Sequence, residues 1–299
     1  MRLVAILLVA ALVLSAAQQV LPAPPTIEQL VDSNRLPEAR ERLKADEAAT
    51  GRTPRTRLLT AMILHREKRY AESLAELQEI LGSEQRDARV YKLFGLNLVS
   101  LGREADAEDY FRAAVKLAPE DLSAQYYLGM SELALSRYVE AERIFRGLAS
   151  RQPSSVEVLT MLGLSLEQQS KPEEAIELYG RAVDAATRAR QPALQPRLYL
   201  GRYCQTLGRF RESVPAFEAV LAEQPGHAEA QRLLGRALLE TGEPGKALPL
   251  LESAVARDPS DRSSRYLLAR AYQRLGRDRD AQLQFQLVRE TTPAPSRTR

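Results

Sequence analysis

The sequence is poor in the residues that most often build chemical sites. Its 299 residues contain one cysteine, two histidines and no tryptophan. A single cysteine cannot form an internal disulfide, and two histidines far apart, without clustered Cys or carboxylates, do not form a metal site. Cys204 falls on the inward face of a predicted helix and is interpreted as a buried structural thiol. His65 is interpreted as a solvated side chain.

The chain also has little net charge. The chain has 42 Lys plus Arg against 39 Asp plus Glu, a formal charge of +3. It lacks the basic excess typical of nucleic-acid-binding proteins, so we expect no nucleic-acid partner. It has no phosphate-cradling glycine loop, and no residue set supplies a nucleophile with its base. The sequence therefore predicts a protein that is not an enzyme and takes no cofactor or metal.

The N-terminus has the pattern of an export signal. Arg2 precedes an uncharged apolar run from Leu3 to Leu14, and small residues follow at positions 15–17. The run is shorter than the about 20 residues that a membrane span needs. This pattern predicts a cleaved signal peptide over 1–17 and a periplasmic or secreted protein with no membrane span after cleavage. The alternative is a protein anchored in the membrane by an uncleaved N-terminal segment. Residues 18–26 are proline-rich and predict a linker.

A fixed period organises the rest of the chain. A small residue recurs every 34 residues, with one step of 38 residues: Ala39, Ser73, Ala107, Ala141, Ala175, Ser213, Ala247 and Ala281. A large residue follows each of them four positions later, on the same helical face: Leu43, Leu77, Phe111, Phe145, Tyr179, Phe217, Leu251 and Phe285. Glycine stands twelve positions before five of the small residues: Gly95, Gly129, Gly163, Gly201 and Gly235. Proline stands twelve positions after five of them.

Each period fits two antiparallel helices joined by a short turn. A glycine inside a helix costs about 1 kcal/mol relative to alanine. Its recurrence at one phase therefore indicates a close approach between the two helices. The 38-residue step predicts a second helix prolonged through Arg188, a break at 191–192, and Pro196 in the first turn of the next helix. We interpret the four extra residues as a local change in pitch, with a functional hinge as the alternative.

With Gly or Ala, Ala, a large residue and Pro at these spacings, the chain resembles the tetratricopeptide repeat family. The steady 34-residue steps do not fit the longer period of the pentatricopeptide repeats. The resemblance covers residues 27–290 and implies an all-α superhelical solenoid of about eight helix–turn–helix units in an exported bacterial protein. The expected units lie near 27–53, 54–87, 88–121, 122–155, 156–193, 194–227, 228–261 and 262–290. Residues 291–299 are expected to form a disordered tail.

In this family, partners bind in a concave groove lined by first-helix side chains. The side chains three positions before, one after and four after the Gly or Ala of each first helix should point into the groove. In units three to five these are Lys92, Leu96, Val99, Tyr126, Met130, Leu133, Thr160, Leu164 and Glu167. In units six to eight they are Leu198, Arg202, Gln205, Arg232, Arg236, Leu239, Tyr266, Arg270 and Gln273. The groove therefore divides into an apolar middle and an arginine-rich C-terminal half. The candidate partner-binding residues are a subset of these positions: Lys92, Leu96, Val99, Tyr126, Met130, Leu133, Leu164, Arg202, Arg232, Arg236, Tyr266 and Arg270.

Two alternatives stay open for this groove. Leu96, Leu133 and Leu164 could tilt into the core, and the arginines could pair with Glu229, Glu240 or Glu243 within the chain. The family's carboxylate clamp is rejected, because Leu96 stands where the clamp needs asparagine.

The sequence as a whole predicts a noncatalytic protein–protein interaction scaffold of the cell envelope. Its partner would be a protein segment with apolar anchors and acidic character. The alternative is a self-associating component of an envelope assembly or secretion complex, which would form a homo-oligomer.

Overall fold

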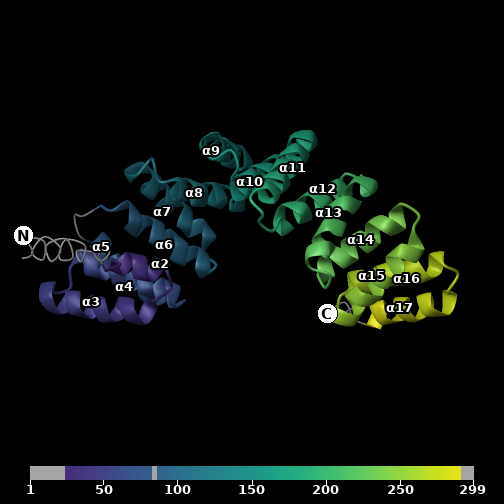
Figure 1. Ribbon diagram of the computed structural model, residues 1–299, viewed down its shortest axis with the longest axis horizontal. Helices are drawn as coiled ribbons and strands as arrows, with labels where there is room; N and C mark the ends of the chain where they lie inside the picture. Colours follow the sequence, from purple (N-terminus) through teal and green to yellow (C-terminus); the bar gives the residue numbers. More distant parts are fainter. Residues whose placement is uncertain (1–23, 83–85, 291–299) are drawn as a thin grey trace, which may run out of the picture. The chain divides into compact units, whose positions relative to one another are not determined.

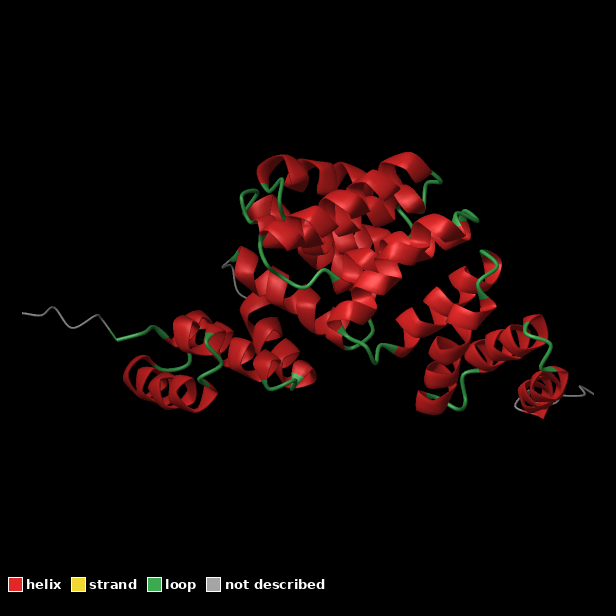
Figure 2. Ribbon diagram, turned by 45° about the vertical axis from the view of Figure 1, so that its right-hand side comes forward, coloured by secondary structure: helices red, strands yellow, loops and turns green. Residues whose placement is uncertain are grey.

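The computed structural model describes residues 24–82 and 86–290, and every regular element in these ranges is an α-helix. The helices α2 to α17 follow one another along the chain (Figure 1), and no strand interrupts them in the part of the chain that is described (Figure 2). The predicted all-α class is therefore confirmed. The expected signal peptide over 1–17 and the expected tail over 291–299 lie outside the described residues. None of the described helices is long and apolar enough to cross a membrane.

The chain forms two compact units that meet in sequence between Arg103 and Glu104. The first unit contains five described helices: α2 (Ile27–Asp32), α3 (Leu36–Thr50), α4 (Pro54–Arg66), α5 (Tyr70–Leu81) and α6 (Ala88–Ser100). Each of them packs against the next in sequence, and α4 also contacts α2 and α6.

The second unit contains eleven helices among its described residues. These are α7 (Glu104–Leu117), α8 (Leu122–Ala134), α9 (Tyr138–Arg151), α10 (Val156–Glu167), α11 (Pro172–Arg188), α12 (Leu194–Thr206), α13 (Phe210–Glu223), α14 (Ala228–Glu240), α15 (Pro244–Arg257), α16 (Arg262–Arg274) and α17 (Asp278–Glu290). Consecutive helices pack together, and so do α8 and α10, α10 and α12, α12 and α14, and α14 and α16. The first helices of successive pairs therefore lie beside one another.

Local sequence signals explain where these helices begin and turn. The Asp121 carboxylate accepts hydrogen bonds from the backbone N–H groups of Ser123 and Ala124, and so caps the N-terminus of α8. Between the helices of a pair, one residue takes a left-handed backbone conformation. Glycine fills this position at Gly242, where φ is 86°, whereas Ser136 reaches φ 59° at the equivalent turn.

The recurring glycines lie beneath the recurring large residues. A Cβ atom added to Gly163 would lie 2.8 Å from Tyr179 Cε1, and one added to Gly201 would lie 2.6 Å from Phe217 Cζ. Both rings are fully buried. The expected close approach is thus present, but it joins a glycine to a ring sixteen residues later rather than one backbone to another. A large side chain fills the space that the glycine leaves open.

The 38-residue step has the predicted form. Helix α11 runs through Arg188, and α12 begins at Leu194 with Pro196 as its third residue. Between them, Arg190 turns the chain with φ 54°, and Ala193 is buried.

The structure confirms the interpretation of Cys204 and corrects that of His65. Cys204 is 2% exposed, and burial raises the pKa of its thiol, so it is a structural thiol as predicted. His65 is not simply solvated, because its Nδ1 lies 2.7 Å from Asn97 Oδ1. Asn97 in turn donates from Nδ2 to Ser73 Oγ at 2.8 Å, and Ser73 donates to the carbonyl of Ala61. Most repeats have alanine at the position equivalent to Ser73. The serine hydroxyl is buried and needs hydrogen-bond partners, which explains this network.

Candidate functional site

Most of the predicted groove positions are open to solvent, at least in part. Lys92, Leu96 and Val99 belong to the first unit, where Val99 is exposed and the other two are partly buried. In the second unit, four candidates are exposed and five are partly buried: Met130, Arg202, Arg236 and Tyr266, then Tyr126, Leu133, Leu164, Arg232 and Arg270. Leu133 also packs against the core around Phe145 and Leu162, which supports the inward tilt as its arrangement.

Three predicted groove residues are wrong, because they are buried: Leu198, Leu239 and Gln205, which is 4% exposed and donates from its side chain to the Leu233 carbonyl. Leu198 is 6% exposed and Leu239 is fully buried. Both belong to the apolar core formed around Phe217 and Leu234, so they pack between helices rather than line a surface.

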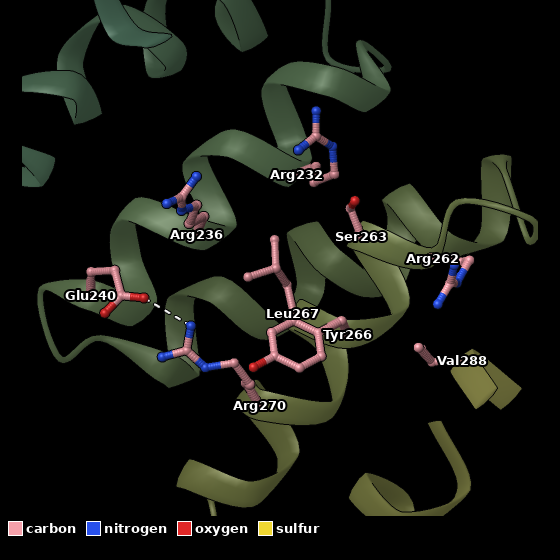
Figure 3. Close-up of a pocket in the computed structure, with 9 residues that line it drawn as sticks. All are labelled: Arg232, Arg236, Glu240, Arg262, Ser263, Tyr266, Leu267, Arg270 and Val288. Atoms are coloured by element: carbon pink, nitrogen blue, oxygen red, sulfur yellow. Dashed lines mark hydrogen bonds and ion pairs between the residues drawn. The ribbon is translucent and has the colours of Figure 1, made fainter. Parts of the chain in front are cut away.

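The predicted arginine-rich half of the groove contains a cavity of about 520 Å³ (Figure 3). Helix α14 contributes Arg232, Arg236 and Glu240, α16 contributes Arg262, Ser263, Tyr266, Leu267 and Arg270, and α17 contributes Val288. The structure thus brings together four predicted residues, namely Arg232, Arg236, Tyr266 and Arg270. Arg202 does not line this cavity.

Helical periodicity places these side chains. Arg232, Arg236 and Glu240 follow one another at four-residue steps on α14, and Arg262, Tyr266 and Arg270 do the same on α16. Residues four apart share one face of a helix, so each helix presents one polar stripe to the cavity. Other positions of both helices carry core leucines, such as Leu234 on α14 and Leu268 on α16, which anchor the two helices to the core.

Arg270 and Arg232 have carboxylate partners within the chain. Arg270 donates from Nη1 to Glu240 Oε1 at 2.8 Å, the pair joined by the dashed line in Figure 3. Arg232 Nε lies 3.5 Å from Asp261 Oδ2, and that carboxylate also caps the N-terminus of α16. Arg274 reaches the same region, since it donates to the carbonyl of Leu239 and lies 3.9 Å from Glu240.

Arg236 is held differently. Its guanidinium carbon lies 5.5 Å from the centre of the Phe210 ring, a cation–π contact worth about 0.5–1 kcal/mol at an exposed site. No carboxylate forms an ion pair with it among the described residues. Four arginines and one glutamate therefore line the cavity, and Arg236 is exposed to solvent.

The alternative that the arginines pair with glutamates within the chain is found in part. Arg270 pairs with Glu240 as expected, and Arg202 Nη1 lies 4.0 Å from Glu229 Oε1. Glu243 instead accepts a hydrogen bond from Lys246 at 2.6 Å. The predicted groove positions did not include Arg262. Its place four residues before Tyr266, on the same face of one helix, could have indicated that it lines the groove.

A second cavity, of about 500 Å³, lies in the part of the groove predicted to be apolar. Of the predicted groove residues, Tyr126 and Thr160 line it, whereas Met130, Leu133 and Leu164 do not. The remaining lining comes from α10, α12 and the connection before α12: Val156, Glu157, Met161, Pro192, Leu194, Gln195, Pro196 and Tyr199.

Within residues 24–82 and 86–290, no group of three or more His, Cys, Asp or Glu side chains is placed to hold a metal ion.

Solved structures with similar folds were found. A chain of the Cut9–Hcn1 hetero-tetramer of the APC/C is 16% identical, with a TM-score of 0.64 over 82% of this chain and 48% of that one. The protein thus spans about half the length of that chain. A MamA double mutant is 20% identical, with a TM-score of 0.53 over 57% of this chain and 94% of its own. A further MamA structure is 21% identical, with a TM-score of 0.52 over 58% and 92%. At these identities the likeness shows the fold alone.

Family models give the assignment. No curated protein matches the sequence. A model described as tetratricopeptide repeat matches residues 93–156, 140–190 and 198–262, which together make up more than half of the chain. A second model of the same description matches residues 239–297. The chain therefore belongs to the tetratricopeptide repeat family.

Proposed function

We propose that this protein is a noncatalytic scaffold whose α14–α16 cavity binds an acidic segment of a partner protein. Tetratricopeptide repeat proteins generally mediate protein–protein interactions and are generally not enzymes, which gives the class of function. The observation that carries the proposal is the cavity of about 520 Å³ lined by four arginines and one glutamate. Its excess positive charge suits a ligand that brings carboxylates.

The chemistry of the cavity favours carboxylates over a general electrostatic attraction. Guanidinium groups donate two parallel hydrogen bonds to a carboxylate, which adds geometric selectivity to the charge attraction. Arg236 is the first contact in this proposal, because it is exposed and no carboxylate among the described residues forms an ion pair with it. Tyr266, which is 49% exposed, provides an aromatic surface beside the charges for an apolar neighbour of the acidic residues.

A peptide pair tests this proposal. The probe is a fluorescein-labelled peptide ending in Leu-Glu-Glu-Asp, compared by fluorescence anisotropy with its Leu-Gln-Gln-Asn counterpart. We expect the acidic peptide to bind more tightly, and Arg236→Glu to weaken its binding at least tenfold. Arg143→Glu is the matched control, because Arg143 is an exposed arginine on α9 and the substitution changes the net charge equally. Equal losses in the two variants, or equal binding of the two peptides, would contradict the proposal.

The cellular setting that we propose is the bacterial envelope. The apolar run over residues 3–14 and the small residues after it support export with cleavage near residue 17. N-terminal sequencing of the protein from a periplasmic fraction tests this. A mature chain that starts near residue 18 is expected. A chain that keeps its first residues and sediments with membranes would support the uncleaved anchor instead.

One observation favours self-association as a second function. Helix α17 is the last described helix, and its Leu283 is 53% exposed. Another copy of the chain could cover this side chain. Light scattering on the wild type and on Leu283→Gln tests the idea, since a monomer at high concentration in both would rule it out.

A further inference from the structure

We propose that the second cavity, between α8, α10 and the α11–α12 connection, binds an apolar side chain of the partner segment with a cationic residue beside it. The inference deepens the proposed function, on which it rests, by naming the other end of the same ligand. It assigns a role to the four-residue insertion.

The aromatic walls of this cavity are held rigidly from behind. Tyr126 meets the buried ring of Phe145 edge-on, with the ring centres 5.8 Å apart and the planes at 72°. Tyr199 stacks on the buried ring of Tyr179, with the centres 5.7 Å apart and the planes at 10°. Because Phe145 and Tyr179 are fully buried, they fix the two outer rings. A ligand would therefore lose little free energy in ordering these walls.

The insertion supplies the opposite wall. Pro192, Leu194 and Pro196 line the cavity, and the buried Ala193 anchors the loop between them. Proline has no backbone N–H, so this wall offers apolar surface with few donors. On α10, the Thr160 hydroxyl is already used, because it donates to the carbonyl of Val156 at 2.6 Å. The cavity thus suits an aliphatic, aromatic or proline side chain.

One charged residue lines the cavity and sets the sign of the neighbouring charge. Glu157 is exposed, and its Oε2 accepts a hydrogen bond from Ser155 Oγ at 3.1 Å. Over the described ranges, no lysine or arginine forms an ion pair with Glu157. A Lys or Arg next to the apolar anchor would complement this carboxylate. The arginine cavity has the opposite preference.

The two cavities lie on the same face of the second unit. Tyr126 and Thr160 stand three positions before Gly129 and Gly163, and Arg232 and Tyr266 hold the same position in their own repeats. The repeat register therefore directs all four side chains alike. A partner segment that uses both cavities has its apolar–basic end toward α8 and its acidic end toward α16.

Peptide selection on the full-length chain tests the inference. The probe is a random, phage-displayed library of 12-residue peptides, from which binders are synthesised and their Kd values measured. We expect enriched peptides to carry an apolar residue next to Lys or Arg. Tyr126→Ala should weaken their binding at least tenfold, and Glu157→Gln should reduce the preference for Lys over Gln at least fivefold. Glu140→Gln, an exposed position on α9, is the control and should leave the preference unchanged.

The variants separate this inference from the proposed function. Loss of binding in Arg236→Glu with none in Tyr126→Ala and Glu157→Gln would overturn the second cavity while the arginine cavity remains supported. The reverse pattern would support the second cavity and contradict the first. Glu157→Gln changes a surface carboxylate and is not expected to affect folding. It therefore tests the second cavity even if Tyr126→Ala lowers the stability of the protein. Selection of peptides that ignore both substitutions would also overturn the inference.

Discussion

Gly129 lies directly beneath the ring of Phe145. A Cβ atom at position 129 would come within 2.8 Å of Phe145 Cζ, closer than such atoms can approach, and the ring is fully buried and cannot move aside. The same relationship joins Gly235 to Leu251 three helix pairs further on. The absence of a side chain is thus what allows α8 and α9 to pack.

Gly129→Leu is expected to lower the free energy of unfolding by roughly 1–3 kcal/mol, because it overpacks this contact. Chemical denaturation measures it. Gly147→Ala is the matched control, since Gly147 also lies within a helix, but a Cβ atom there would meet nothing within 4 Å. The control should gain up to about 1 kcal/mol from helix propensity. An unchanged denaturation midpoint in Gly129→Leu would contradict the packing argument.

Glu132→Gln should destabilise the second unit, because Glu132 is a buried carboxylate shared by two arginines. Its Oε1 accepts a hydrogen bond from Arg112 at 2.8 Å, and its Oε2 lies 3.3 Å from Arg137 Nη1. Removing one partner of a fully buried pair costs about 3–5 kcal/mol, and the half-exposed arginines reduce this to roughly 1–3 kcal/mol. Thermal unfolding of Glu132→Gln measures the loss.

Glu120→Gln provides the surface comparison for that loss. Glu120 pairs with Arg151 at 2.6 Å, but its side chain is 85% exposed. Its substitution should cost less than about 0.5 kcal/mol. Similar losses in both variants would show that burial does not set the value of the Glu132 network.

Serine at the small position of a repeat should matter more at Ser73 than at Ser213. Ser73→Ala leaves the amide of Asn97 without its oxygen partner in a buried site, which should cost about 1–2 kcal/mol. Ser213→Ala should cost less than about 1 kcal/mol, since Gln205 Nε2 lies 3.5 Å from Ser213 but donates to the Leu233 carbonyl at 2.7 Å. Denaturation of both variants gives the comparison, and an equal or reversed order would contradict it.

Repeat spacing predicted the contacts that depend on residues close in sequence. The pairing of the helices, the break near Pro192 and the crowding above Gly129 all follow from the local period and turn chemistry, so they were predictable before the structure. The partners of His65 were not predictable in this way. They depend on side chains from neighbouring helices, such as Asn97 lying 32 residues from His65, whose relative rotation no local pattern specifies. For the same reason, spacing placed Leu198 and Leu239 on the surface when they belong to the core.

Acid should weaken the second unit through Glu142. Burial alone would raise the pKa of this carboxyl, but hydrogen bonds from Lys171, Arg146 and Gln169 outweigh burial and lower the pKa to about 2. A carboxyl whose pKa is lower in the folded state stabilises the fold above its unfolded pKa of about 4.5 and loses that contribution as the pH falls toward 2. We therefore expect roughly 1–2 kcal/mol of pH-dependent stability between pH 4.5 and 2 from this residue, because its charged partners Arg146 and Lys171 are partly exposed and solvent screens the attraction. Glu142→Gln should be less stable than the wild type at pH 7, and the difference should shrink toward pH 2. Unfolding free energies at several pH values measure this, and a difference that stays constant with pH would contradict the assignment.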